Sequence, residues 1–170
     1  KLCENKFHEK EAVKIVEEIS QGLKEFHSRN LSFNCLNIKN IFVNKKDIIK
    51  ADVLSYLENK KFPVKIVEDE GQEQQIQIEE EFDVEKDIHD LGIILYSLLT
   101  GNLTFDSKNY KKEISNENLI GIIEKSTNLN LESKYRNIDR FILDLKSFMQ
   151  SGDLSDETYD VEEVIVDKKK

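Results

Sequence analysis

The sequence predicts a mainly α domain with short β hairpins, arranged around one central buried helix. The first observation is that residues 87–101 are apolar on nearly every face of a helix, as in a helix enclosed by protein. The second is that residues 8–27 and residues 138–149 carry apolar side chains at helical spacing on one face, as helices that cover a core do. The third is a set of short apolar runs between polar turns, which favours short strands.

The central helix is expected to begin at Asp87 and to end at Gly101. An Asp suits the N-cap because its carboxylate accepts a backbone N–H of the first turn, and a Gly can adopt the left-handed conformation that closes a helix. The run is too short, and too acidic at its start, to span a bilayer. We therefore expect the rest of the chain to wrap this helix.

Short strands are expected in two regions. The first follows the N-terminal helix and contains three apolar runs, at residues 31–33, 41–43 and 48–51. In the second, Val64–Val67 and Gln75–Ile78 flank a turn that contains Gly71. Because their apolar residues alternate or are β-branched, this second region predicts a β hairpin.

Composition limits the classes of function. The chain has 170 residues, of which 38% are hydrophobic and 35% are charged, and this fits one domain with a substantial core. Its net charge of -9 argues against a nucleic-acid partner and an anionic membrane, because their phosphates would be repelled. The two cysteines, Cys3 and Cys35, are too few for a disulfide framework and suggest a reducing compartment. No signal peptide or transmembrane run is recognisable, so a cytoplasmic protein is expected.

The motifs resemble those of the large, C-terminal lobe of protein kinases. The run from Leu23 to Leu31 resembles the end of the kinase E helix, and residues 33–43 with Asp52 resemble the catalytic and metal-binding loops in order and spacing. Asp87, with Gly92 five residues later, resembles the start of the F helix, in which the Asp holds the catalytic loop. The resemblance therefore implies a kinase-like fold around the central helix.

In this resemblance, residues 1–150 form a kinase-like C-terminal lobe without the small N-terminal lobe, because no Gly-rich loop, strand Lys or C-helix Glu is recognisable. Arg136 falls where the family has the Arg that pairs with the Glu of Ala-Pro-Glu. That motif is not recognisable here, and Ile78 or one of residues 79–81 lies near its place. The acidic residues 151–170 are expected to form a flexible tail or a docking strand.

The same resemblance implies that catalysis is lost. The His-Arg-Asp of active kinases is replaced by Phe33-Asn34-Cys35 and the catalytic-loop Lys by Asn37, so both the base and the phosphate-contacting Lys are missing. Asn40 and Asp52 remain where the family places its magnesium ligands, but Val53-Leu54 replaces the Phe-Gly that follows the Asp. We therefore expect no cofactor and no bound Mg-ATP.

Several of these residues also have simpler roles. Cys35 lacks a recognisable His or Asn partner, so a small buried thiol is favoured over a nucleophile. His27 and His89 are expected to pack or to form hydrogen bonds rather than to bind a metal. Asn40 and Asp52 can serve as turn residues, since their side chains bond local backbone.

The sequence therefore favours a pseudokinase that acts as a scaffold or interaction subunit of a larger assembly, with other protein subunits as its partners. Without a small lobe, apolar residues of the strand loops and of the hairpin lose their usual cover, and exposed apolar surface marks interfaces. These interface candidates are Phe42, Val53, Leu54, Ile66 and Ile76.

Two alternatives remain. One is a serine/threonine-type protein kinase whose N-lobe is supplied by a missing segment or by another chain, and the other is a nucleotide-responsive binding module. Cys35 and Asn37 count against the enzyme. A cytoskeletal or ciliary setting is expected only from the protist-like abundance of Lys, Asn, Ile and Glu.

Overall fold

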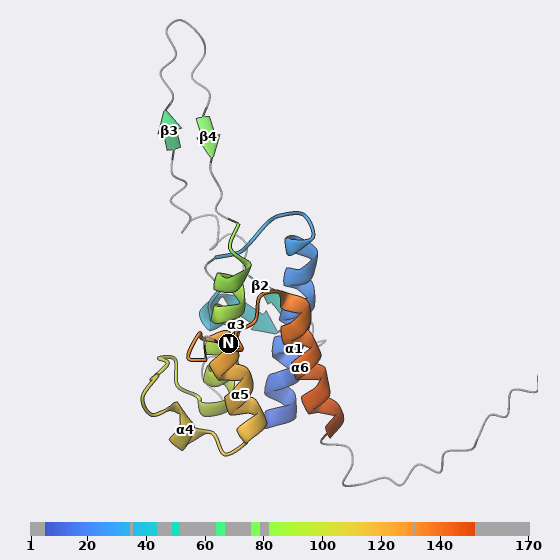
Figure 1. Cartoon of the computed structure of the whole chain (residues 1–170), viewed down its shortest axis with the longest axis vertical. Coiled ribbons are helices and arrows are strands. Elements are labelled where there is room, and N and C mark those ends of the chain that lie inside the picture. The colour runs from blue at the N-terminus through green and yellow to red at the C-terminus, as the bar shows by residue number, and fades with distance from the viewer. Residues whose placement is uncertain are drawn as a thin grey trace, which may run out of the picture.

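The computed structural model describes residues 6–34, 36–43, 49–51, 64–66, 76–78, 82–130 and 132–151. These residues form a mainly helical structure, as the sequence predicted (Figure 1). The longer helices are α1 (Glu9–His27), α3 (Val84–Thr100), α5 (Glu117–Ser126) and α6 (Ile138–Ser151). Two short helices, α4 (Tyr110–Glu113) and the 3₁₀ helix η2 (Ile38–Asn40), lie in the connections.

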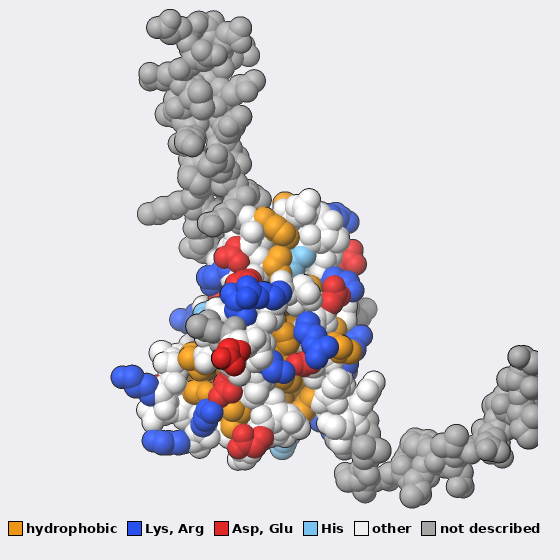
Figure 2. Space-filling model, in the orientation of Figure 1, with side chains coloured by type: hydrophobic (Ala, Val, Ile, Leu, Met, Phe, Trp, Pro, Cys, Tyr) orange, Lys and Arg blue, Asp and Glu red, His pale blue; other side chains and the backbone are white. Residues whose placement is uncertain are grey.

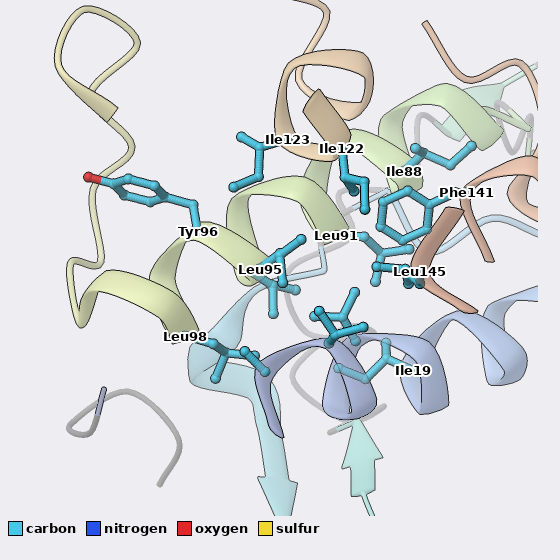
Figure 3. Packing of buried hydrophobic residues seen from close by; sticks show 14 of the residues in the cluster. Ile19, Ile88, Leu91, Leu95, Tyr96, Leu98, Ile122, Ile123, Phe141 and Leu145 are labelled. Atoms are coloured by element: carbon cyan, nitrogen blue, oxygen red, sulfur yellow. The ribbon is translucent and has the colours of Figure 1, made fainter. Parts of the chain in front are cut away.

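Helix α3 lies at the centre of the helical body. It packs against α1, α5 and α6, and α1 in turn packs against α6. Figure 3 shows the side chains that meet there: Leu91 and Leu95 of α3 lie between Ile19 of α1 and Phe141 and Leu145 of α6. Leu91, Leu95, Phe141 and Leu145 are fully buried. The core therefore consists of apolar faces turned toward one helix that is buried on most sides.

The central helix begins one turn earlier than the sequence predicted. Its N-cap is Asp83, whose carboxylate accepts the backbone N–H of Lys86 at 2.9 Å, so Asp87 lies inside the first helical turns. The prediction of Asp87 as the cap was wrong because two Asp residues, spaced four apart, precede the apolar run. The other end was predicted correctly: Gly101 ends the helix with φ of 78°.

Gly92 lies where α3 and α5 come closest. A Cβ atom at this position would lie 2.0 Å from Ser126 Oγ and 2.8 Å from Ser126 Cβ. Ser126 is itself buried and donates to the backbone carbonyls of Ile122 and Ile123, each at 3.0 Å. The two helices can therefore approach this closely only because residue 92 has no side chain.

In the described part of the chain, four short strands form two antiparallel pairs. Strand β1 (Ile41–Val43) pairs with β2 (Ile49–Ala51), and β3 (Val64–Ile66) pairs with β4 (Ile76–Ile78). The register of the second pair sets Val64 opposite Ile78, which is the hairpin pairing expected from the sequence; the turn between them lies outside the described residues. In Figure 1, β3 and β4 stand away from the helical body.

The strand expected at residues 31–33 is not present. This stretch has an irregular backbone, because the N–H of Phe33 donates to the side chain of Asp87 instead of to a neighbouring strand.

Across the described ranges, no helix is both long enough and apolar enough to cross a membrane.

Candidate functional site

The residues that resemble a catalytic loop meet the start of α3 at one buried carboxylate. Asp87 is fully buried, and its Oδ2 accepts the backbone N–H of Phe33 at 2.8 Å while its Oδ1 accepts that of Asn34 at 2.6 Å. His27, at the end of α1, places Nε2 2.9 Å from the same Oδ2. One side chain thus joins the end of α1, the following loop and the central helix.

The backbone of Asn34 adopts a conformation that few residues tolerate. Its φ is 56°, in the left-handed region, which Asn enters more readily than most side chains other than Gly. The hydrogen bond from its N–H to Asp87 holds this conformation. Asp87 therefore determines the path of the loop as well as its distance from α3.

His27 acts as a hydrogen-bonding partner of Asp87. Its side chain is only 8% exposed, and Nε2 is the nitrogen that faces the carboxylate. The other ring nitrogen, Nδ1, has no hydrogen-bond partner among the described residues. His89 is less buried and places Nδ1 3.5 Å from Asp90. Within the described ranges, no group of three His, Cys, Asp or Glu residues is arranged to hold a metal ion.

Asn37 caps a short helix. Its Oδ1 accepts the backbone N–H of Lys39 at 2.9 Å, at the start of η2. This is the position at which the kinase resemblance places a Lys that reaches a phosphate. The amide is instead engaged in local capping, the turn chemistry typical of Asn.

The structure describes only some of the other predicted site residues. Asn40 ends η2, Phe42 lies in β1, and Ile66 and Ile76 are paired across β3 and β4. Cys35, Asp52, Val53 and Leu54 lie outside the described residues. The structure thus brings Phe33, Asn34 and Asp87 into contact, with Asn37 close by in the chain.

Arg136 pairs with the first turn of the central helix. Its Nη1 lies 3.2 Å from Glu85 Oε1, and Lys134 Nζ lies 2.6 Å from Glu85 Oε2. The hydrogen bond from Lys134, followed by the charges of Lys134 and Arg136, lowers the pKa of Glu85. The partner expected among residues 79–81 lies outside the described residues, so the pairing found here is with Glu85.

Sequence reasoning missed a cavity between the η2 segment and α3. It has a volume of about 130 Å³, and two of its lining residues, Asp90 and Ser97, are polar positions seven apart on α3. That spacing puts both on the same face of α3. Ser97 interrupts the apolar second half of the helix, and this was a signal in the sequence from which a polar position in the core could have been inferred.

No protein-family model matches this chain, and no curated protein has a significantly similar sequence.

In the described part of the loop, backbone N–H groups are held by hydrogen bonds to one buried carboxylate. The Asp87 carboxylate is enclosed and accepts from two backbone N–H groups, so its role is to position the loop.

Proposed function

We propose that this chain is a catalytically inactive, kinase-like subunit that acts through protein contacts. The observation that carries this proposal is the buried Asp87 of the central helix, which accepts the backbone N–H groups of Phe33 and Asn34. The kinase resemblance assigns this role to the Asp of the F helix. The closeness of α3 to α5 at Gly92, five residues later, also supports the resemblance.

The loop residues themselves support inactivity. Cys35 stands at the position of the base, where the kinase resemblance expects the carboxylate that accepts the proton of a substrate hydroxyl. Asn37 stands at the position of the phosphate-contacting Lys, and its side chain caps η2. Asn40 and Asp52 are then remnants of a metal site that lacks its other partners.

Exposed apolar side chains support a role in protein contacts. Phe26, Leu31 and Phe82 are 38%, 40% and 44% exposed, and all three lie close in the chain to the loop or to the start of α3. The rings of Phe26 and Phe33 meet edge to face at 5.7 Å, so this apolar surface continues into the core. Figure 2 shows apolar side chains between charged ones on the face of the helical body that it presents.

The β3–β4 pair is the second proposed contact. An antiparallel pair with a free edge can add a strand from a partner, and alternate side chains then provide specificity. Ile66 and Ile76 are opposite each other in the register and therefore lie on one face of the pair. Together with Phe42, Val53 and Leu54, they form the proposed interface with other subunits.

Phosphoryl transfer tests the loss of catalysis. Purified chain incubated with Mg-ATP and a general protein substrate should transfer no phosphate above background, because both the base and the phosphate-contacting Lys are missing. Sustained transfer that disappears in Asp52→Ala would show that the chain is an enzyme. A rise in melting temperature with Mg-ATP, without transfer, would instead favour the nucleotide-responsive module.

Sedimentation in native extract tests the assembly. Replacing Ile66 and Ile76 by Lys should move the chain from a large complex to the position of a monomer, because two charges would occupy the apolar contact. A matched control is Lys65→Gln with Gln77→Lys, which alters the opposite face of the same pair and keeps the net charge. If the wild-type chain already sediments as a monomer, the scaffold proposal is wrong.

A further inference from the structure

The cavity beside η2 is amphiphilic and is lined by the η2 segment, by α3 and by Leu103, which follows α3 in the chain. Leu36 and Ile38 form one wall, and Ile93 and Ile94 of α3 form the other. Its volume of about 130 Å³ is close to that of an engineered cavity that holds a benzene molecule, roughly 150 Å³. The space therefore suits one amino-acid side chain.

Two buried polar atoms at this cavity have no hydrogen-bond partner among the described residues. They are Asp90 Oδ2 and Ser97 Oγ, on side chains of residues that are 7% and 2% exposed. Leaving such a group unsatisfied costs about 1–3 kcal/mol each, so a fold selected for stability alone would have replaced them. Both residues line the same cavity, so a polar ligand in it would satisfy both atoms.

The spacing of the two groups sets the length of the ligand. Seven residues of helix separate Asp90 from Ser97 by about 10 Å along the axis of α3. Ile93 and Ile94 lie between them. The ligand therefore has a polar group at each end and an aliphatic part in the middle.

The charged groups near Asp90 determine which kind of polar group a ligand can place against its carboxylate. Its Oδ1 already pairs with Lys86, His89 lies 3.5 Å from the same oxygen, and Lys39 is on the cavity wall. A further cation would meet two lysines, and an anion would meet the carboxylate. An uncharged hydrogen-bond donor is the group that remains.

We propose that this cavity binds a glutamine side chain of a protein partner. The carboxamide N–H donates to Asp90 Oδ2, the methylene groups lie against Ile93 and Ile94, and the backbone carbonyl of the same residue accepts from the Ser97 hydroxyl. Small side-chain rotations of Asp90 and Ser97 open these atoms to the ligand. The proposal rests on the proposed function only in that the ligand belongs to a protein.

Binding of capped amino acids tests the chemistry directly. Chemical shifts of the backbone amides of Asp90, Ile93 and Ser97 are followed while N-acetylglutamine methylamide is added. Saturable shifts are expected in the millimolar range, as for small fragments. The corresponding Glu, Lys and Leu compounds are the comparison ligands, and each should bind about tenfold more weakly, since each loses a hydrogen bond or meets a like charge.

Variants of the two polar residues test the site. Asp90→Ala and Ser97→Ala should each weaken binding of the Gln compound about tenfold, as the loss of one buried hydrogen bond does. Ser97→Ala should also keep or raise the melting temperature, because it removes an unsatisfied buried hydroxyl. Ser147→Ala on α6 is the matched control, because that exposed Ser lies outside this cavity.

The possible outcomes are distinct. If the Lys compound binds more tightly than the Gln compound, the inference that the ligand is uncharged is wrong. If the Leu compound binds as tightly as the Gln compound, the cavity is apolar and does not recognise a carboxamide. Binding that survives in both variants, or no saturable shift with any compound, would also overturn the proposal. None of these results bears on phosphoryl transfer or on the β3–β4 contact, so failure here is separable from failure of the proposed function.

Discussion

At the residue scale, Asp87 is the side chain on which the loop depends most. Replacing it with Ala removes the acceptor of two backbone N–H groups and leaves them buried, so we expect a loss of about 1–3 kcal/mol in the free energy of unfolding. Denaturant titration measures this loss. Asp139→Ala is the control: it removes an exposed carboxylate paired with Lys24 and should change the free energy by less than about 0.5 kcal/mol. An unchanged midpoint for Asp87→Ala would contradict the anchoring role.

Gly92 provides a second test at this scale. Helix propensity favours Gly→Ala by about 1 kcal/mol, but the new Cβ would lie 2.0 Å from Ser126 Oγ, so we expect a net loss of about 1–3 kcal/mol. Gly22→Ala on α1 is the matched control, because nothing lies within 4 Å of its Cβ position, and it should stabilise the protein.

A double-mutant cycle shows whether the contact with Ser126 is the cause. Ser126→Gly removes both atoms nearest the new methyl group, so it should restore part of the stability that Gly92→Ala loses. Additive losses would mean that the strain lies elsewhere in the interface between α3 and α5.

At the scale of elements, a carboxylate ties α5 to α6. Asp144 of α6 accepts from Lys125 Nζ at 2.9 Å and from the Tyr135 hydroxyl at 2.7 Å. Burial disfavours its charged form, but the hydrogen bonds from Lys125 and Tyr135 outweigh burial, so the pKa of Asp144 is lowered. Burial, followed by the hydrogen bond to Asp144, raises the pKa of Tyr135, which therefore remains a donor.

This pair of helices should consequently be sensitive to acid. Because the folded-state pKa of Asp144 lies below its unfolded value, its contribution is complete above about pH 4 and is lost as the pH falls through the folded-state pKa. We expect Asp144→Asn to lower the free energy of unfolding by about 1–2 kcal/mol at neutral pH. The difference from wild type should shrink below about pH 4. A difference that stays constant with pH would contradict this coupling.

At the scale of the whole molecule, the core is made by helices α1, α3, α5 and α6. Among the residues that the structure describes, the buried hydrophobic ones run from Ala12 to Leu145, and α6 ends at Ser151. We therefore expect a chain cut after Ser151 to keep its helical circular dichroism and its melting temperature. A chain cut before Ile138 should not fold cooperatively, because it loses the fully buried Phe141 and Leu145. A large drop in melting temperature for the longer chain would mean that residues 152–170 contribute to the fold.

The helical class and the central position of α3 could both be predicted from the sequence. An apolar run without a polar face has no favourable place at a surface, so its burial follows from composition alone. The role of Asp87 in holding the loop was also predicted, from the kinase resemblance. The start of the helix was not predicted correctly, because Asp83 and Asp87 have the same capping chemistry and only the backbone path shows which one caps.

Features that depend on segments distant in the sequence could not be predicted from it and are visible only in the folded chain. The contact of Gly92 with Ser126 joins two helices, and the cavity joins η2 to two polar positions on α3. Helical spacing shows that Asp90 and Ser97 share a face, but a pattern along one helix does not show what packs against that face. Whether a buried polar atom is satisfied depends on its neighbours in space, and for these two residues only the folded chain shows them.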